Sequence, residues 1–236
     1  MKKTFLSAFL FCASLFSFAQ KKIDLSSRPS DHLLIQLSSD RWLNAPDSIS
    51  SKRKGSSRGA NVYFMLDKPF KTNPKFSVAF GLGISTSHLF FKKLNAAIDG
   101  NTETLKFTNL DTLESYKKYK VSTSFLELPV ELRFTSRPDK NNKSFKMALG
   151  IKVGTLINAH TKGKQLMSAS GGKLNDVIEK INSKSYFNTT RISTTARIGV
   201  GNFSLFGTYT INSSIFKDNT TAPINLLQTG ITLSGL

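Results

Sequence analysis

Apolar residues alternate with polar or small residues along most of the chain beyond residue 30. In residues 76–85 one set of alternate positions holds Phe, Val, Leu and Ile, and the other holds Ser, Ala and Gly. Residues 145–154, 191–200 and 227–234 repeat this pattern. A period of two is typical of β-strands whose two faces meet different environments. The pattern predicts eight strands, near residues 31–42, 59–69, 75–91, 118–137, 144–161, 187–200, 202–215 and 224–236.

The lengths of the strands and of their connections point to a membrane. Several predicted strands exceed ten residues, whereas about five or six is usual and about nine to eleven tilted residues cross a bilayer. The connections are mostly alternately long and short: 43–58, 70–74, 92–117, 138–143, 162–186, around 201, and 216–223. In an antiparallel meander the short turns therefore gather at one end, as in bacterial outer-membrane barrels.

Alternation alone leaves open which face is inside. A soluble sandwich or lipocalin-like barrel would turn its apolar face inward. Here glycine and other small residues crowd the polar face, as a narrow lumen requires, and the middle of the apolar face carries no charge. We therefore predict an all-β, eight-stranded, antiparallel up-and-down transmembrane β-barrel, forming one domain over residues 21–236.

Residues 1–20 resemble a cleaved signal peptide. Lys2 and Lys3 precede an apolar run over residues 5–16, and Ser17-Phe18-Ala19 provides a small-x-small site for cleavage after Ala19 or Gln20. The only cysteine, Cys12, would leave with this segment, so the mature chain would have no disulfide and no thiolate metal site.

Charges of both signs lie on the face predicted to line the lumen. We expect a structural ion-pair network that plugs the barrel, formed by Glu127, Glu131, Arg133, Lys146, Lys152, Arg191 and Arg197. A gated polar channel is the alternative. Acid–base catalysis by Glu127 and Glu131 is disfavoured because four strand residues separate them by roughly 13 Å. Pro129 lies inside the fourth strand, where a proline marks an edge or a bulge. The apolar parity also changes here, and a bulge near 125–129 explains both features.

The basic charge does not indicate nucleic-acid binding. The formal net charge is +18, and +16 once Lys2 and Lys3 are removed, but the basic residues are dispersed and no nucleic-acid motif accompanies them. One cluster lies in a predicted external loop, where it would contact lipopolysaccharide phosphates or simply be solvated: Lys52, Arg53, Lys54 and Arg58. The pair Lys117-Lys118 would reach the same headgroups.

Two further features concern the predicted rim. Leu174, Val177, Ile178 and Ile181 have helical spacing, which predicts a short amphipathic helix at 174–182 that caps the mouth or binds a partner. Aromatic residues near strand ends predict interfacial girdles: Trp42, Tyr63, Phe90, Phe91, Tyr119, Phe187, Tyr209 and Phe216.

Motifs for catalysis, cofactors and metals are lacking. His32, His88 and His160 fall on different predicted strands without metal-ligand spacing. Gly81-Leu-Gly83 and Gly199-Val-Gly201 are not followed by a helix, so neither forms a phosphate loop. We expect no cofactor, no metal and no enzymatic activity, with a lipid-modifying barrel enzyme as the alternative from another class.

Several short motifs resemble the PorT-like outer-membrane β-barrel family of Bacteroidetes. They are the signal ending in Phe-Ala-Gln, the strand Leu-Glu-Leu-Pro-Val-Glu-Leu at 126–132, the glycine-rich long strands and the closing Gln-Thr-Gly-Ile-Thr-Leu at 228–233. The resemblance covers most of residues 31–236 and implies an eight-stranded barrel in the outer membrane. The founding member is tied to the type IX secretion machinery, a role we do not carry over. We expect a structural or interaction protein that contacts outer-membrane lipid, lipopolysaccharide and other envelope or secretion proteins. The alternative is a small channel or a secretion-apparatus component.

Overall fold

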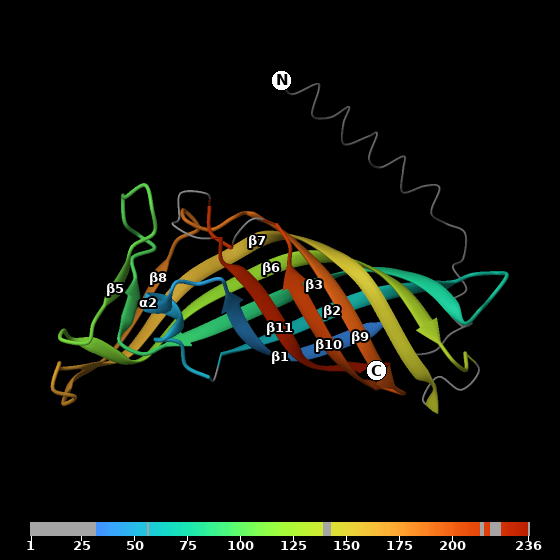
Figure 1. Cartoon of the computed structure of the whole chain (residues 1–236), viewed down its shortest axis with the longest axis horizontal. Helices are drawn as coiled ribbons and strands as arrows, with labels where there is room; N and C mark the ends of the chain where they lie inside the picture. Colours follow the sequence, from blue (N-terminus) through green and yellow to red (C-terminus); the bar gives the residue numbers. More distant parts are fainter. Residues whose placement is uncertain (1–31, 56, 139–142, 213–214, 218–222, 236) are drawn as a thin grey trace, which may run out of the picture.

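Eight antiparallel strands form a closed ring in the computed structural model, which describes residues 32–55, 57–138, 143–212, 215–217 and 223–235 (Figure 1). Around the ring the strands are β1 (Leu33–Leu43), β2 (Arg58–Pro69), β3 (Phe76–Phe91), β6 (Ser115–Thr135), β7 (Phe145–Met167), β9 (Thr190–Val200), β10 (Phe203–Thr210) and β11 (Asn225–Ser234). The predicted fold class and strand positions are confirmed. The signal peptide predicted at 1–20 lies outside the described residues.

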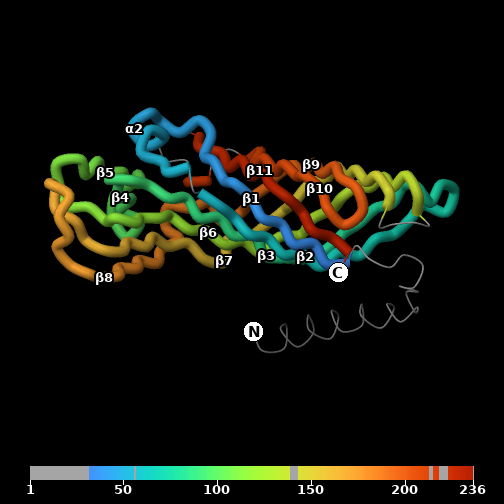
Figure 2. Tube along the Cα trace, turned by 90° about the horizontal axis from the view of Figure 1, so that it is seen from below, coloured from blue at the N-terminus to red at the C-terminus, as the bar shows by residue number. Residues whose placement is uncertain are grey.

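Backbone pairing closes the ring through the first and last strands. β1 pairs with β11 from Leu34↔Ser234 to Leu43↔Asn225, and each remaining neighbour in the ring is also antiparallel. The strand ends at Pro69 and Phe76, at Thr135 and Phe145, and at Val200 and Phe203 lie at one end of the barrel, where β11 ends (Figures 1 and 2). The strand ends that lead into the longer connections lie at the other end. Among the described residues, no helix is long and apolar enough to cross a bilayer.

The longer connections contain small elements of their own. They are α2 (Asp47–Ser50), the paired strands β4 (Leu94–Ala96) and β5 (Phe107–Asn109), and β8 (Lys173–Asn182). β7 pairs with β9 over its first half and with β8 over residues 160–167. β6, β7 and β8 therefore extend beyond the ring as a sheet of three strands (Figure 1).

The helix predicted at 174–182 is wrong, because β8 occupies these residues as a strand. The upper half of β7 extends beyond β9, so its free edge offers backbone donors and acceptors to the returning chain. Pairing such as Lys162↔Lys180 satisfies them. The helical spacing of four apolar residues does not compete with this tertiary pairing, since Leu174 and Ile178 remain 52% and 59% exposed.

The half of the barrel nearest the short turns has an apolar outer surface. We call this surface the lipid-facing band; its side chains include Phe80, Leu82, Ile84, Leu126, Leu128, Val130, Leu149, Ile151, Val153 and Ile157, each between 36% and 62% exposed. Alternate residues of the same strands point inward and are polar, charged or small. This arrangement is the reverse of a soluble protein and matches a barrel surrounded by lipid.

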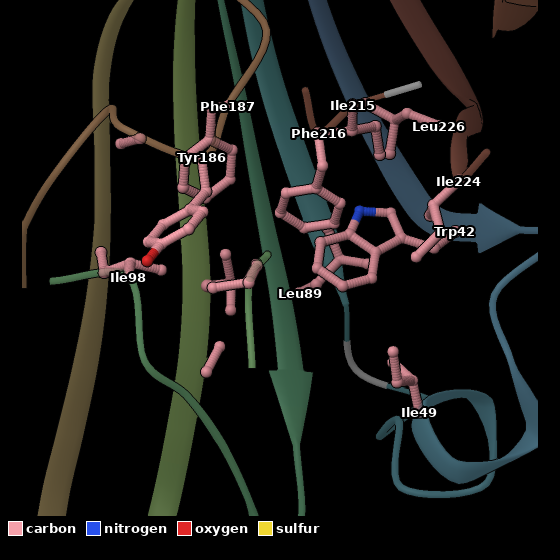
Figure 3. Close-up of a cluster of buried hydrophobic side chains, with 14 of the residues drawn as sticks. Trp42, Ile49, Leu89, Ile98, Tyr186, Phe187, Ile215, Phe216, Ile224 and Leu226 are labelled. Atoms are coloured by element: carbon pink, nitrogen blue, oxygen red, sulfur yellow. The ribbon is translucent and has the colours of Figure 1, made fainter. Parts of the chain in front are cut away.

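Beyond the lipid-facing band the sidedness of the barrel reverses. Large apolar side chains fill the interior there and form what we call the outer cluster: Trp42, Ile49, Leu89, Phe91, Ile98, Tyr119, Val121, Phe125, Leu156, Tyr186, Phe187, Ile215, Phe216, Ile224 and Leu226 (Figure 3). Trp42 packs on Phe91 and Phe216 with ring centroids 5.3 Å apart in both pairs. The long loops and strand ends are thus held by a core of the soluble type.

The aromatic girdle prediction is largely wrong for this reason. Five of the eight aromatics belong to the outer cluster, and Tyr63 points into the lumen with 2% exposure. Phe90 and Tyr209 are partly exposed. The five aromatics of the outer cluster lie near strand ends as predicted, but inside the barrel rather than on its outer surface.

The predicted bulge exists, but its extra residue belongs to β7 rather than β6. The pairing passes from Ser124↔Asn158 to Phe125↔Leu156, which leaves Ile157 as the additional residue. β6 keeps one parity throughout, and its inward side chains change from charged to apolar because they enter the outer cluster. Pro129 lies inside the ring, not at an edge; the β3–β6 pairing breaks around it, between Phe80↔Val130 and Gly83↔Glu127.

Truncation of the outer cluster tests its contribution to stability. Phe91→Ala should lower the free energy of unfolding by about 3–5 kcal/mol, because it leaves a cavity beside Trp42. The control Leu113→Ala removes a side chain that is 52% exposed and should change it by less than about 0.5 kcal/mol. Urea unfolding in detergent micelles, followed by fluorescence of the single tryptophan, measures both. Equal effects would contradict a packed outer cluster.

Candidate functional site

The layer of the lumen nearest the long connections is built around Glu127. Arg191 reaches its Oε1 through two guanidinium nitrogens, at 2.6 and 3.0 Å, and the Tyr63 hydroxyl donates to Oε2 at 2.5 Å. The same guanidinium donates to Ser85 Oγ at 2.7 Å and lies 3.9 Å from the centre of the Phe125 ring. Glu127 and Arg191 therefore neutralise each other directly beneath the outer cluster.

Lys152 occupies the middle of the lumen. Its Nζ donates to Tyr63 Oη at 3.2 Å, to Gln36 Oε1 at 3.3 Å and to Thr208 Oγ1 at 3.4 Å. It also lies 4.7 Å from the centre of the Tyr63 ring. These partners come from β1, β2 and β10, so the ammonium group links opposite sides of the ring.

A second charged layer, closer to the short turns, is built around Glu131. Its Oε2 accepts hydrogen bonds from Arg133 Nε at 2.9 Å and from an Arg197 guanidinium nitrogen at 3.1 Å. Arg133 also lies 3.9 Å from Asp67. A buried carboxylate is tolerated only when charged or polar partners replace its water, and two arginines do so here.

All seven residues predicted for the lumen point inward and are between 1% and 6% exposed. The structure places Glu127 with Arg191, and Glu131 with Arg133 and Arg197. Lys152 lies at the centre. Lys146 lies on the inner wall toward the short turns, opposite Thr135 of β6.

Sequence reasoning missed the polar partners on β1, β2 and β11. Gln36, Ser38 and Asp40 alternate along β1 and face inward, and both oxygens of Asp40 accept hydrogen bonds from Gln228, at 3.1 and 3.2 Å. The alternation of these three polar residues in the sequence would have identified the inward face of β1. The contact of Tyr63 with Glu127 spans 64 residues and leaves no local signal.

Gly83 provides the room for the bond between Tyr63 and Glu127. It lies in register with both residues, on the strand between theirs. A Cβ at this position would lie 2.3 Å from Tyr63 Cδ1 and 2.2 Å from the Val62 carbonyl oxygen. The glycine-rich polar face therefore reflects the crowding of large side chains into a narrow ring.

The four basic residues predicted to contact lipopolysaccharide do not form one cluster. Lys52 pairs with Asp111, and Lys54 Nζ donates to the Lys117 carbonyl oxygen at 3.1 Å. The hydrogen bond from Lys52 lowers the pKa of the Asp111 carboxyl. Arg53 forms a backbone bridge with Phe91, whereas Arg58 is exposed on the outer wall, 5.7 Å from the Phe90 ring centre.

Two of the three histidines lie in one row across neighbouring strands. His88 pairs with Ser122 in register, and Ser122 pairs with His160. His88 Nδ1 is 2.9 Å from Ser122 Oγ. His32 lies toward the other end of the barrel, stacked with Phe64. Within the described residues, no group of three or more His, Cys, Asp or Glu side chains could hold a metal ion.

Comparison with known proteins gives one family and one structural likeness. The model of the family described as outer membrane protein beta-barrel domain matches residues 18–215. Among solved structures, the chain is similar to the crystal structure of Ail, the attachment invasion locus protein of Yersinia pestis, in complex with the heparin analogue sucrose octasulfate. That likeness has 9% identity and a TM-score of 0.34, and it covers 88% of this chain and 99% of that chain. No curated protein matches the sequence.

A double-mutant cycle tests the Glu127–Arg191 pair. Glu127→Ala alone should cost about 3–5 kcal/mol of unfolding free energy, because it leaves a buried guanidinium uncompensated. The double variant Glu127→Ala/Arg191→Ala should cost less than the sum of the two single variants, with a coupling of about 0.5–3 kcal/mol. Urea unfolding in micelles measures each step. Additive costs would mean that the two charges do not depend on each other.

Proposed function

Since the chain belongs to the outer membrane protein beta-barrel domain family, we propose that it acts in the cell outer membrane as a closed, non-enzymatic barrel whose outer surfaces carry its interactions. The location in the outer membrane follows from the family and the fold. The structural or interaction role is our proposal.

The burial of the lumen side chains carries this proposal. Lys152, Glu127, Tyr63, Gln36 and Gln228 are each exposed by 2% or less, although they lie across the middle of the ring. A conducting pore would expose charged side chains of this kind to water. Their mutual hydrogen bonds instead support a plug, and the outer cluster lies above it as a second barrier.

The interaction surfaces lie at the end with the long connections. β8 is exposed along most of its length and pairs with β7 on one side, so its other edge offers backbone groups on which a partner's strand can be added. Leu174 and Ile178 add exposed apolar side chains to this edge. These features favour a partner among envelope proteins, a secretion apparatus included.

The row of His88 and Ser122 gives a second candidate, a lipid-modifying enzyme. A histidine 2.9 Å from a serine hydroxyl is the geometry of a base beside its nucleophile. However, Ser122 is only 1% exposed, and the charge nearest His88 is the ammonium group of Lys120. A positive neighbour opposes the imidazolium that a general base must form. The site thus favours the non-enzymatic reading.

Planar-bilayer recording tests the plug. The wild-type chain should give no discrete conductance steps, and Tyr63→Ala/Lys152→Ala should give them because the two side chains fill the middle of the lumen. Lys162→Ala on the outer wall is the control and should remain silent. Discrete steps from the wild-type chain would replace the plug with a channel.

Lipid turnover tests the enzyme. Purified chain incubated with radiolabelled phospholipid and lipopolysaccharide should release or transfer no acyl chain above background. Turnover that Ser122→Ala abolishes, while the folded state survives, would establish the enzyme and overturn the proposal. The control Ser124→Ala changes a serine on the same side of β6, two residues away.

A further inference from the structure

A basic surface lies on the outward face of the sheet, outside the lumen, and continues from the barrel wall onto β8. We call it the basic face and define it by six side chains on five neighbouring strands: Arg58, His88, Lys120, His160, Lys162 and Lys180. One row follows the register Arg58↔His88, His88↔Ser122 and Ser122↔His160. The next row follows Lys120↔Lys162 and Lys162↔Lys180. Residues opposite each other in antiparallel strands project from the same face, so these side chains form one continuous surface.

The basic face lies directly above the lipid-facing band. On β3, β6 and β7 the band ends at Ile84, Leu126 and Ile157, and the basic residues follow three to six positions further along the same outward face. At about 3.3 Å per residue and a tilt of about 35–45°, this places them roughly 7–15 Å beyond the hydrocarbon. That is the level of the headgroups and phosphates of the facing leaflet.

The charges of the basic face are not balanced by the protein. Two lysines outside this face have carboxylate partners, Lys52 with Asp111 and Lys173 with Asp176. In the part of the chain that the structure describes, no ion pair includes Arg58, Lys120, Lys162 or Lys180. Like charges placed directly opposite each other across strands are destabilising, so the row Lys120–Lys162–Lys180 favours an external anion.

The pKa values of the two histidines reflect the same concentration of positive charge. Burial first, and then the charges of Lys180 on β8, Lys120 on β6, His88 on β3 and Lys162 on its own strand, lower the pKa of His160 to about 4. Burial, Lys120 and Arg58 lower the pKa of His88. Every charge that acts on these rings is positive.

An aromatic ring holds part of the face in place. Phe90 lies opposite Lys120 in the second row, with the Arg58 guanidinium carbon 5.7 Å and the Lys120 Nζ 6.0 Å from its ring centre. Contacts of this kind reduce the freedom of long basic side chains before a ligand binds. The cations are therefore partly positioned for an anion.

We propose that the basic face binds the phosphate groups of anionic lipid in the outer leaflet, that is, of phosphorylated lipid A headgroups. The inference deepens the proposed function, on which it rests for the orientation of the long loops toward the exterior. It moves the lipopolysaccharide contact from Lys52, Arg53 and Lys54 in the loop to the barrel wall, with Arg58 common to both sets. Acyl chains of the same lipid lie against the lipid-facing band below, so one molecule meets both surfaces.

The test measures binding of fluorescent bisphosphorylated lipid A to the full chain in neutral detergent micelles. Lys120→Gln/Lys162→Gln/Lys180→Gln should weaken binding at least tenfold, given roughly a five-fold contribution from each basic residue at a membrane surface. The matched control Lys68→Gln/Lys71→Gln/Lys75→Gln removes the same charge at the opposite end of the barrel, and should bind within twofold of wild type. Equal loss in both variants, or no loss in the first, would overturn the proposal.

Further arms separate the sources of phosphate. Dephosphorylated lipid A should bind the wild-type chain as weakly as bisphosphorylated lipid A binds the triple variant; tight binding would show that acyl contacts alone suffice. Inorganic pyrophosphate at the same concentration should not displace the lipid, and displacement would assign the face to a soluble anion instead. Two separate measurements report on the proposed function itself. A band on a denaturing gel that shifts only after boiling reports the folded barrel, and silent bilayer recordings report the plug. A failure of the proposed function is therefore distinguishable from a loss of lipid binding.

A spectroscopic readout follows from the histidines. Because a bound phosphate stabilises the imidazolium, lipid A should raise the pKa of His160 from about 4, and affinity should increase as the pH falls between the free and bound pKa values. NMR titration of the His160 ring measures the shift in the full chain. A pKa unchanged by saturating lipid A would mean that the phosphates do not reach the basic face.

Discussion

Closure of the ring is the constraint on which the rest of the structure depends. A strand in lipid has no water to satisfy its backbone groups, so each must find a partner strand on both sides. Eight strands meet this condition with the smallest interior seen in such barrels. The interior has room for side chains but little for solvent, and every inward charge must therefore bond to another side chain. Arg191, Lys152 and Arg197 are placed by this requirement, as is the glycine at position 83 that admits Tyr63.

The strands are longer than the bilayer is thick, so the two parts of the barrel lie in different environments. Inside the lipid-facing band the barrel is polar within and apolar outside. Beyond it, the same strands are apolar within, around Trp42 and Phe216, and basic outside. The extra residue Ile157 lies in β7 where these two regions meet. It changes which alternate residues of that strand face the interior. The long loops are consequently anchored by packing of the soluble type rather than by the membrane.

Most of the fold could be predicted because period two is a local signal and a ring of adjacent strands needs little long-range information. The inward charges followed from the same parity. Failures occurred where the environment, not the pattern, decides the outcome. Leu174 and Ile178 have helical spacing, yet the free edge of β7 makes residues 173–182 a strand. Trp42 and Phe91 were placed at the interface because the sequence does not mark where lipid ends and an apolar interior begins. The row of His88, Ser122 and His160 depends on register across three strands, which no single segment encodes.

The basic face also bears on how deeply the barrel sits in its bilayer. A shift of the molecule toward the short-turn side would draw Lys120 and Lys162 into hydrocarbon, where each cationic side chain costs about 2–4 kcal/mol near the midplane. A shift the other way would expose Ile84, Leu126 and Ile157, at the upper limit of the lipid-facing band, to water. The free energy of the barrel therefore has a steep minimum at one depth along the membrane normal. The position at which the apolar residues end sets this depth.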